Sequence, residues 1–492
     1  MKSLMADMIA LRLPDIPDGP MNNRLYRVLR DAIFEGRLAP RTRLPASRDL
    51  SRELAIARNT VVHAYNQLLT EGYVEVRPGN GTFVVDALPD IPTGRTPHAS
   101  RRPSAPALSA RGERLIRDAS ASPHQWGAFM PGVPDVTRLP KARLAKLFRD
   151  AWRNPPPGML TYAHGGGLPA LKQALSEYLA VSRSLACTPD QIVITEGSHQ
   201  AIDLTSRMLA DVGDVAWVED PGYWGARNTM RANGLQLQGW PVDADGICVP
   251  DEPEGPPPRF IFLTPSHQYP LGSVMPLSRR RRILALARKW GCWVIEDDYD
   301  SEMRFAGHPI AAMQGMEEDA PVIYMGTFSK TLYPGLRLGY MVLPEALAPA
   351  FQAAQAELYR EGHYMTQTAI AHFIEQGDYA RHVRRMRLLY SQRRAMLANL
   401  IDRRLGSGWL HENGSEAGLH LVIDLPEKMD DVAVERSAYS QGVLTRALSR
   451  YYLDRSQVRS GLLLGYACVP ENQMAERFEK IVSALAEQLR KT

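Results

Sequence analysis

The sequence contains few cysteines and no long hydrophobic run. Its four cysteines are scattered without a Cys-x-x-Cys pair, so neither a disulfide framework nor a structural zinc site is indicated. No apolar stretch approaches the roughly 20 residues that a membrane-spanning helix needs. The first residues include Asp7 and lack the small-residue cleavage pattern of a signal peptide. We therefore expect a cytoplasmic protein that has no membrane partner and no bound metal.

Net positive charge is also scarce, but it is unevenly distributed. The whole chain of 492 residues carries a formal charge of only +4, and its length predicts two or more domains. Between residues 22 and 85 there are ten arginines and six acidic residues, whereas the rest of the chain is close to neutral. A small basic segment ahead of a large neutral one is typical of a DNA-binding unit, although an ordinary soluble surface could give the same balance.

Residues 22–85 have the pattern of three short helices followed by a β-hairpin. Apolar residues recur at helical spacing from Leu25 to Ile33, and Ser47 is a candidate N-cap for a second helix that ends near Leu54. Residues 73–76 and 82–85 alternate as strands do, with a glycine-rich turn between them. This order predicts a winged-helix domain. The core-facing residues expected in its third helix are Val61, Tyr65, Leu68 and Leu69.

The third predicted helix begins with polar residues, as the base-reading end of a recognition helix must. Arg48 in the second helix and the turn glycines are placed to contact phosphates, which would position the domain on DNA. The full set of expected DNA contacts is Arg48, Arg58, Asn59, Thr60, His63, Gly79 and Gly81. The segments LPASR, RNTV, GY and GNGTFV within about 64 residues resemble the GntR family of bacterial repressors. The alternative is a protein-binding winged helix with a solvated basic face.

The remainder of the chain predicts a linker followed by a large α/β domain. Residues 86–122 are rich in Pro, Ala, Ser and Arg and lack a sustained apolar period, which is typical of a linker. From residue 123 to residue 492, strand-like runs alternate with amphipathic helices, which predicts a mainly parallel sheet with helices on both faces. The expected strands are 191–195, 215–219, 260–264, 293–296, 322–325 and 338–343.

Two of these strands end in residues that suit an anionic, ring-bearing ligand. The first runs through a glycine to Ser198 and His199 at the start of a helix, where backbone N–H groups favour a phosphate. The fourth ends in the acidic run Glu296-Asp297-Asp298-Tyr299-Asp300. A buried carboxylate there needs a partner, which a cationic pyridinium nitrogen would supply. The alternative is an acidic loop or a site for a hard cation.

Lysine is rare in this chain, and one lysine stands apart. Only nine of the 58 basic residues are lysines, and eight of them lie in ordinary charged helical or terminal contexts. Lys330 instead follows Gly326-Thr327-Phe328-Ser329 directly after a predicted strand. An apolar, hydroxyl-lined setting disfavours the ammonium form, which is what Schiff-base formation requires. Arg337 lies seven residues further on and offers a planar fork suited to phosphate.

These motifs resemble the fold-type I aminotransferases, and in particular the MocR/GabR-type subgroup in which a GntR domain precedes such a domain. The resemblance implies pyridoxal 5'-phosphate (PLP) as cofactor, a smaller C-terminal α+β subdomain and a homodimer, with exchange of DNA-binding heads between subunits left open. It also implies a role for each matching residue. Lys330 would hold PLP covalently, Asp297 would pair with the pyridine nitrogen, Tyr299 would bind the ring hydroxyl and Tyr223 would stack on the ring. The phosphate would be held by Ser198, His199 and Arg337, with Thr327 or Ser329 assisting. Tyr162 would enter the neighbouring subunit's site.

The sequence departs from the aminotransferase pattern at two places. The usual Asn-Pro-x-Gly loop reads His267-Gln268-Tyr269-Pro270-Leu271-Gly272, a form that the subgroup shares. The arginine that normally grips a substrate carboxylate is replaced by Leu463, for which Arg459 or Arg446 could substitute.

Three hypotheses follow from this pattern. The first is a PLP-dependent DNA-binding regulator that senses PLP itself, an amine or an amino acid. The second is an active aminotransferase with an attached DNA-binding head. The third is a regulator whose large domain no longer binds PLP.

Overall fold

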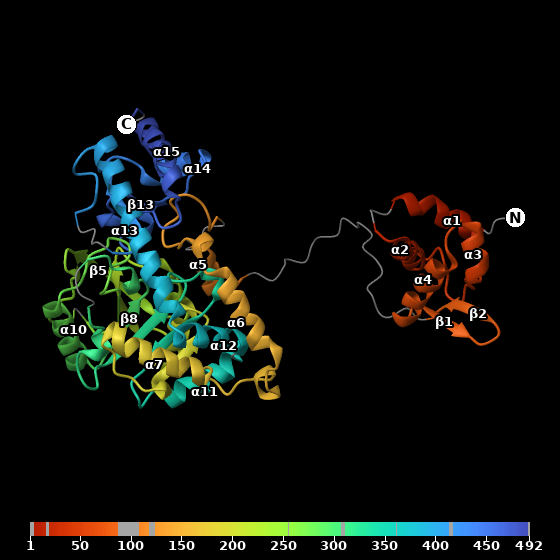
Figure 1. The fold of residues 1–492 in the computed structure, drawn as a ribbon, viewed down its shortest axis with the longest axis horizontal. Helices are drawn as coiled ribbons and strands as arrows, with labels where there is room; N and C mark the ends of the chain where they lie inside the picture. The colour runs from red at the N-terminus through yellow and green to blue at the C-terminus, as the bar shows by residue number, and fades with distance from the viewer. Residues whose placement is uncertain are drawn as a thin grey trace. The chain divides into compact units, whose positions relative to one another are not determined.

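The computed structural model describes residues 4–15, 19–86, 108–117, 124–253, 255–306, 310–360, 362–412 and 417–490. The chain forms two compact units that divide between Ala107 and Leu108 (Figure 1). Among the described helices, none is both long and apolar enough to cross a membrane.

The N-terminal unit is a winged helix with one additional helix. The expected three helices and hairpin are present. They are α2 (Met21–Phe34), α3 (Ser47–Glu53), α4 (Arg58–Thr70), β1 (Val74–Arg77) and β2 (Gly81–Val84). The additional helix α1 (Leu4–Arg12) buries Ala6 and Ile9 in the core that the other helices share. The compact unit therefore begins earlier in the chain than the predicted residue 22.

Two details predicted for this unit are wrong. Ser47 is the first residue of α3 rather than its N-cap, because Ala46 occupies the cap position with an extended backbone. Leu69 is 42% exposed, whereas its neighbour Leu68 is fully buried. Consecutive helical residues point about 100° apart, so only one of two adjacent leucines can face the core here.

The wing is a two-stranded sheet, and the chain before α3 pairs with its second strand through an isolated bridge between Arg43 and Phe83. β1 and β2 are antiparallel, with Val74 opposite Val84. The Leu44 amide donates to the Thr82 carbonyl at 2.8 Å, and the Val84 amide donates to the Thr42 carbonyl at 3.0 Å. These bonds fix the wing against the helices.

The C-terminal unit is built on an eight-stranded sheet with the order β3-β10-β9-β8-β7-β4-β5-β6. Its central pairs β5-β4, β4-β7, β7-β8 and β8-β9 are parallel, whereas β10 runs antiparallel to both β3 and β9. The mainly parallel sheet expected from the sequence is confirmed. The strands are β3 (Ile192–Thr195), β4 (Val215–Asp220), β5 (Gln236–Asp243), β6 (Gly246–Ile247), β7 (Phe260–Leu263), β8 (Trp293–Asp298), β9 (Val322–Thr327) and β10 (Gly339–Val342).

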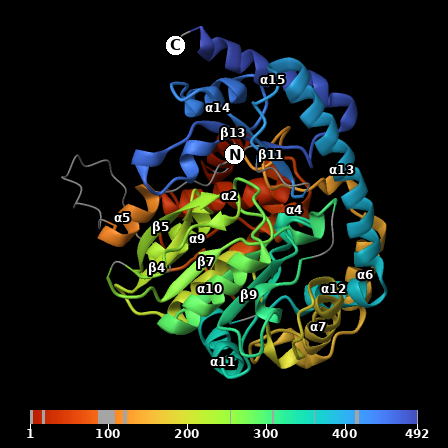
Figure 2. The same cartoon turned by 90° about the vertical axis from the view of Figure 1, so that its left-hand side faces the viewer.

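Helices cover both faces of this sheet, as Figure 2 shows. Ile192 and Ile194 pack against one layer, whereas Val193 between them packs against the other, as the alternation of side chains along a strand requires. The first layer contains α6 (Lys141–Arg153), α7 (Pro169–Arg183), α10 (Leu277–Trp290) and α12 (Tyr364–Glu375), and the second contains α8 (Ser198–Leu209), α9 (Trp224–Ala232) and α11 (Ala348–Tyr359).

A long helix joins the main sheet to a smaller C-terminal subdomain. Tyr379 and Val383 in α13 (Asp378–Leu405) pack in the core of the main sheet, whereas Leu397 and Ile401 further along pack in the C-terminal core. The subdomain has a three-stranded sheet of order β11-β13-β12. Its elements are β11 (His420–Asp424), α14 (Asp431–Ser440), β12 (Arg446–Ala447), β13 (Gly461–Gly465) and α15 (Glu471–Leu489).

The segment predicted as a linker contains one helix. Of residues 86–122, the structure describes 86 and 108–117, and α5 (Ala110–Arg117) occupies most of the second stretch. This helix packs against α9 but has no buried residue. With only eight residues, it is too short to stand out as a periodic segment within a stretch rich in Pro, Ala, Ser and Arg.

Candidate functional site

The carboxyl ends of β3, β4, β7, β8 and β9 meet at one edge of the main sheet and surround a cavity of about 290 Å³. Open α/β sheets bind ligands at this edge. Nine residues that the sequence singled out line the cavity together, namely Ser198, His199, Tyr223, Asp297, Tyr299, Thr327, Ser329, Lys330 and Arg337.

The acidic run Glu296–Asp300 at the carboxyl end of β8 consists mainly of paired carboxylates. Three of its carboxylates are paired one by one with basic side chains. The pairs are Glu296 with Arg280 at 3.9 Å, Asp298 with Arg183 at 2.7 Å and Asp300 with His267 at 2.9 Å. Within the described ranges, no group of three or more His, Cys, Asp or Glu side chains could hold a metal ion. The alternative of a hard-cation site is therefore not supported.

Asp297 is the acid of this run that faces the cavity. It is 3% exposed, and among the described residues its Oδ1 atom has no hydrogen-bond partner. Burial, together with repulsion from Asp298, raises the pKa of Asp297 to about 7, and the attraction of Lys330 opposes the shift only in part. A buried carboxylate with an unmatched oxygen is a binding site for a cationic N–H group.

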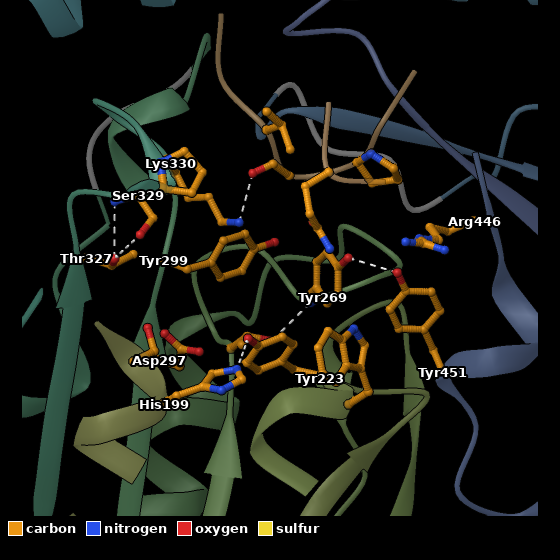
Figure 3. A pocket seen from close by; sticks show the side chains of 18 of the residues that line it. His199, Tyr223, Tyr269, Asp297, Tyr299, Thr327, Ser329, Lys330, Arg446 and Tyr451 are labelled. Carbon is orange, nitrogen blue, oxygen red and sulfur yellow. Dashed lines mark hydrogen bonds between the residues drawn. The ribbon is translucent and has the colours of Figure 1, made fainter. Parts of the chain in front are cut away.

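Lys330 follows β9 and directs its amine into the same cavity (Figure 3). Its Nζ donates to the Gly132 carbonyl oxygen at 2.8 Å. Burial lowers the pKa of Lys330, and the negative charges of Asp300 and Asp297 offset part of this effect. The amine of this half-buried residue is thus fixed in direction and shifted toward the neutral form that attacks an aldehyde.

A corner of the cavity is suited to an anion. α8 begins at Ser198 after Gly197, whose φ of +93° is accessible mainly to glycine. The guanidinium of Arg337 lies next to this glycine, since its Nη1 is at an ordinary contact distance of 3.5 Å from where a Cβ of Gly197 would stand. Opposite them, Thr327 Oγ1 and Ser329 Oγ are 3.0 Å apart. Helix N–H groups, a guanidinium and two hydroxyls form a cradle for a phosphate.

Two tyrosines on the cavity wall are held by histidines. The Tyr223 hydroxyl is 2.7 Å from Nε2 of His199, and the Tyr299 hydroxyl is 2.9 Å from Nδ1 of His267. Burial and the nearby charges of Arg337 and Lys330 lower the pKa of His199, which favours its neutral form. These bonds fix both rings at the cavity (Figure 3).

Tyr162 is the predicted site residue that does not line this cavity. It is 75% exposed, and the guanidinium of Arg360 lies 5.7 Å from its ring centroid. Exposure agrees with a residue that acts outside its own chain's cavity, so its assignment to a neighbouring subunit stays a prediction.

Several lining residues were missed by the sequence reading. Gly132 comes from a loop nearly 200 positions before Lys330, and Tyr451 comes from the C-terminal subdomain. No local pattern connects such distant segments. Tyr269 could have been found, because it stands inside the departing loop that follows β7. The further missed residues are Gln125, Pro131, Val133, Trp224, Thr264 and Pro334.

Leu463, Arg459 and Arg446, the three residues considered at the position that binds a substrate carboxylate, lie in different environments. Leu463 is fully buried in an apolar cluster beneath the cavity. The side chain of Arg459 is 60% exposed and pairs with Asp424 at 3.6 Å, outside the cavity lining. Arg446 lines the cavity.

In the N-terminal unit, the basic residues at the start of α4 and in α3 are exposed. Arg48, Arg58 and His63 are on the surface, and Arg58 Nε donates to Ser47 Oγ at 3.4 Å. Among the described residues neither arginine forms an ion pair, whereas Arg37 and Arg77 pair with Glu35 and Glu75. The expected contacts Asn59, Thr60, Gly79 and Gly81 also lie on α4 or the wing, exposed or half-buried. Among the described residues of this unit, Arg48 and Arg58 therefore share with Arg27 and Arg43 the property of being exposed arginines without an ion pair, which leaves their charge available to DNA.

Arg43 is a residue of this surface that the sequence reading missed. It is exposed and bridges to Phe83 in β2, and its Nε would lie 3.0 Å from a Cβ at Gly81. The glycine therefore brings a guanidinium to the wing.

Comparisons with known proteins agree with this division of the chain. Residues 21–84 match the family of bacterial regulatory proteins called gntR, and residues 139–481 match aminotransferase class I and II. The probable rhizopine catabolism regulatory protein MocR of Rhizobium meliloti is 40% identical over 473 residues, covering 95% of this chain and 94% of its own. The uncharacterized HTH-type transcriptional regulator YdeL of Bacillus subtilis is 31% identical over 467 residues, covering 95% and 97%.

A solved structure shows the same fold in the larger unit. The kynurenine aminotransferase of Pyrococcus horikoshii superposes with a TM-score of 0.67 at 23% identity and covers 78% of this chain and 96% of its own. The likeness confirms the fold-type I aminotransferase architecture.

Proposed function

Because the chain belongs to the MocR-type subgroup of the GntR family, it is a DNA-binding transcription regulator, and we propose that its larger unit binds PLP and controls DNA binding through that site. It would act in the cytoplasm, where its DNA lies. The active-aminotransferase alternative has less support, because the relatives that match nearly the whole chain are named as regulators.

The observation that carries the PLP proposal is the meeting of three unlike groups in one cavity. Lys330 presents an amine whose pKa is lowered, Asp297 presents a carboxylate with an unmatched oxygen, and Arg337 lies beside the N-terminus of α8. These groups suit the aldehyde, the ring nitrogen and the phosphate of PLP in turn. A cavity without PLP function has no need for all three.

In this proposal PLP, when bound, supplies an aldehyde that an amine can attack and a ring that withdraws electrons. Lys330 provides the attacking nitrogen, and Asp297 holds a proton on the ring nitrogen. Tyr299 binds the ring hydroxyl, and Tyr223 covers the ring. Ser198, His199, Arg337, Thr327 and Ser329 bind the phosphate.

We further propose that the regulator is a homodimer. Tyr162 would enter the site of the neighbouring subunit, and it is exposed at 75% together with Trp152 at 61% and Leu160 at 58%. Large apolar side chains gathered within eleven residues are typical of an interface that a second copy covers. An exchange of heads between the two subunits is compatible with this arrangement.

DNA affinity of the full chain with and without PLP tests the proposed function. A target duplex is first selected from a random DNA pool. Removing PLP and restoring it is expected to change the dissociation constant reversibly by about 5- to 100-fold, because allosteric coupling commonly amounts to 1–3 kcal/mol. An unchanged dissociation constant in protein shown to contain PLP would contradict regulation through this site.

Loss of Arg58 is expected to weaken DNA binding strongly. The Arg58→Ala variant should bind the selected duplex about 5- to 100-fold more weakly, because a base-reading arginine contributes about 1–3 kcal/mol. Arg43→Ala should instead weaken binding to all DNA sequences alike. The slope of the logarithm of the binding constant against the logarithm of the salt concentration should also fall by about one, as expected for a lost phosphate contact. The matched control is Arg37→Ala, which removes an exposed arginine that is paired with Glu35. Equal losses in Arg37→Ala and Arg58→Ala would show that only net charge matters.

Two half-sites on one duplex should bind much better than one. A symmetric dimer presents two recognition helices, so paired half-sites spaced by whole helical turns place both heads on one face of the DNA. Fluorescence anisotropy with duplexes that carry one half-site, two half-sites in phase and two half-sites offset by about half a turn measures this. Equally tight binding to a single half-site would exclude the dimeric arrangement.

A further inference from the structure

A second, smaller cavity lies behind one wall of the cavity that contains Lys330. It has a volume of about 150 Å³ and is surrounded by α7, α13 and the segments that follow β7 and β8. His267 lines this second cavity, and its Nδ1 is 2.9 Å from the hydroxyl of Tyr299, which lines the first. The His267–Tyr299 pair therefore separates the two cavities.

Three arginines line the second cavity, and one of them is already engaged. Arg183 pairs through Nε with Asp298 at 2.7 Å, and its other two nitrogens each donate to an oxygen atom at 2.7 Å. The carboxylate of Asp300 is likewise paired, with His267 at 2.9 Å. These pairs build the cavity wall and add little net charge to it.

The other two arginines carry charge that no carboxylate neutralises. Among the described residues, neither Arg304 nor Arg387 forms an ion pair, in contrast to Arg183. The Nε of Arg304 is buried without a hydrogen-bond partner, whereas the Nε of Arg387 donates to the backbone carbonyl of Glu302 at 2.9 Å. A buried N–H group without an acceptor is costly in free energy, so it is typical of a site that a ligand completes.

Glu302 provides the carboxyl group that opposes these two charges. Burial, together with repulsion from Asp298, raises the pKa of Glu302 to about 7, so this group is only partly ionised at neutral pH. Its charge therefore cancels less than one of the two guanidinium charges. In its neutral form the same group is a further hydrogen-bond donor. The second cavity thus favours an anion and disfavours a cation.

The size and the access of the second cavity indicate a small ligand. Its volume is about 150 Å³, against about 290 Å³ for the first cavity, which suits a ligand of only a few non-hydrogen atoms. Arg387 is exposed, so solvent reaches one end of the cavity. Two guanidinium groups from different segments can bind several oxygen atoms of one ligand at once. A small oxyanion meets all these conditions.

We propose that the second cavity binds a small oxyanion, which Arg304 and Arg387 hold. The site does not depend on the proposed function, because none of the described residues that line it is assigned to PLP. Where PLP is bound as proposed, the two sites are linked through His267 and Tyr299. An anion beside His267 changes the electrostatic potential at the tyrosine hydroxyl that contacts the ring hydroxyl, so each ligand influences the other.

Calorimetric titration of the full-length, PLP-loaded protein tests the proposal. Bound PLP fills the phosphate cradle beside Arg337, so an added anion must bind elsewhere. The probes are inorganic phosphate, sulfate and acetate, with chloride as the reference at constant ionic strength. At least one oxyanion should bind saturably and more tightly than chloride. Tighter binding of phosphate and sulfate identifies a tetrahedral ligand, and tighter binding of acetate identifies a carboxylate. Binding of no oxyanion, or equal binding of chloride, overturns the proposal.

Arg304→Gln and Arg387→Gln should each weaken the preferred oxyanion by about 10- to 100-fold, as the loss of a charged hydrogen bond implies. The matched control is Arg384→Gln, which removes an exposed arginine of α13 outside the cavity lining and should bind as the wild type does. Circular dichroism and the absorbance of bound PLP show that each variant is folded and loaded. If Arg304→Gln does not fold, the exposed Arg387 decides the question. Unchanged affinity in the Arg387→Gln variant, or an equal loss in Arg384→Gln, overturns the assignment.

Failure of this inference is distinguishable from failure of the proposed function. If the wild type binds no PLP, the same titration is carried out with Arg337→Ala, which removes the guanidinium of the phosphate cradle. Oxyanion binding that is lost when Arg304→Gln is added to this variant supports the second cavity while the proposed function fails. Conversely, bound PLP without saturable oxyanion binding overturns the second cavity alone.

The link between the two cavities has a spectroscopic readout of its own. The visible absorbance band of bound PLP should shift as the oxyanion saturates wild-type protein, because the potential at the Tyr299 hydroxyl changes. The same additions should leave the band of Arg304→Gln unchanged. A band that is constant in saturated wild-type protein overturns the link through His267.

Discussion

Lys330→Ala is expected to abolish the visible absorbance of the protein after incubation with PLP. The amine lines the cavity, is directed by the Gly132 carbonyl and is shifted toward its neutral form, so it is the group able to bond covalently with the cofactor aldehyde. Borohydride reduction followed by mass spectrometry should find about one PLP fixed per wild-type chain and none in the variant, because the reduction requires a carbon–nitrogen double bond. The regulated change in DNA affinity should disappear with it.

Lys289→Ala is the control for a general effect of lysine loss. Lys289 lies on the surface and pairs with Glu252, away from the cavity. It should keep the full absorbance and the full mass increase. A PLP adduct that persists in Lys330→Ala and maps to another lysine would remove the chemical basis of the proposed function.

Asp297→Asn is expected to act in opposite directions with and without PLP. In loaded protein it removes the carboxylate that pairs with the ring nitrogen, so PLP affinity should fall about 10- to 100-fold, as for a broken charged hydrogen bond. In PLP-free protein it removes a buried carboxylate with an unmatched oxygen, so the variant should be more stable than the wild type. A functional group that lowers the stability of the empty protein is expected at a ligand site.

The stabilisation of PLP-free Asp297→Asn should depend on pH. The pKa of Asp297 is raised to about 7 in the folded protein from an ordinary value near 4. The folded state therefore binds this proton more tightly, and the wild type loses stability as pH rises from about 4 to 7. The melting temperatures of variant and wild type should coincide near pH 4, differ by a few degrees at pH 7 and diverge no further above it. If the difference in melting temperature between variant and wild type were the same at every pH from about 4 to 7, the pKa of Asp297 would not be raised in the folded protein.

The parts of the molecule that could be predicted from the sequence are those with local signals. The winged helix follows from helical spacing and a glycine turn, and the main sheet follows from short apolar runs between amphipathic helices. Nine cavity residues could be named because each stands within a few positions of a predicted strand end. Parallel strands then bring these ends together at one edge.

The remainder depends on contacts between distant segments. Gly132 and Tyr451 reach the cavity from opposite ends of the larger unit's sequence, so neither position has a local pattern that marks it. Arg446 and Arg459 could both be named from the sequence, but the choice between them required the folded structure, in which Arg446 lines the cavity and Arg459 does not. α1 and α5 were missed for a different reason, since helices of nine and eight residues are too short to give a reliable periodic pattern.

Helix α13 has a mechanical consequence for the larger unit. Its 28 residues span about 42 Å at 1.5 Å per residue, with one end embedded beside the main sheet and the other beneath the C-terminal strands. A shift of the C-terminal strands is therefore expected to tilt this helix as a whole. Its far end packs against α12, and Asp378 there pairs with Arg143 of α6, so spin labels at that end are expected to register the tilt.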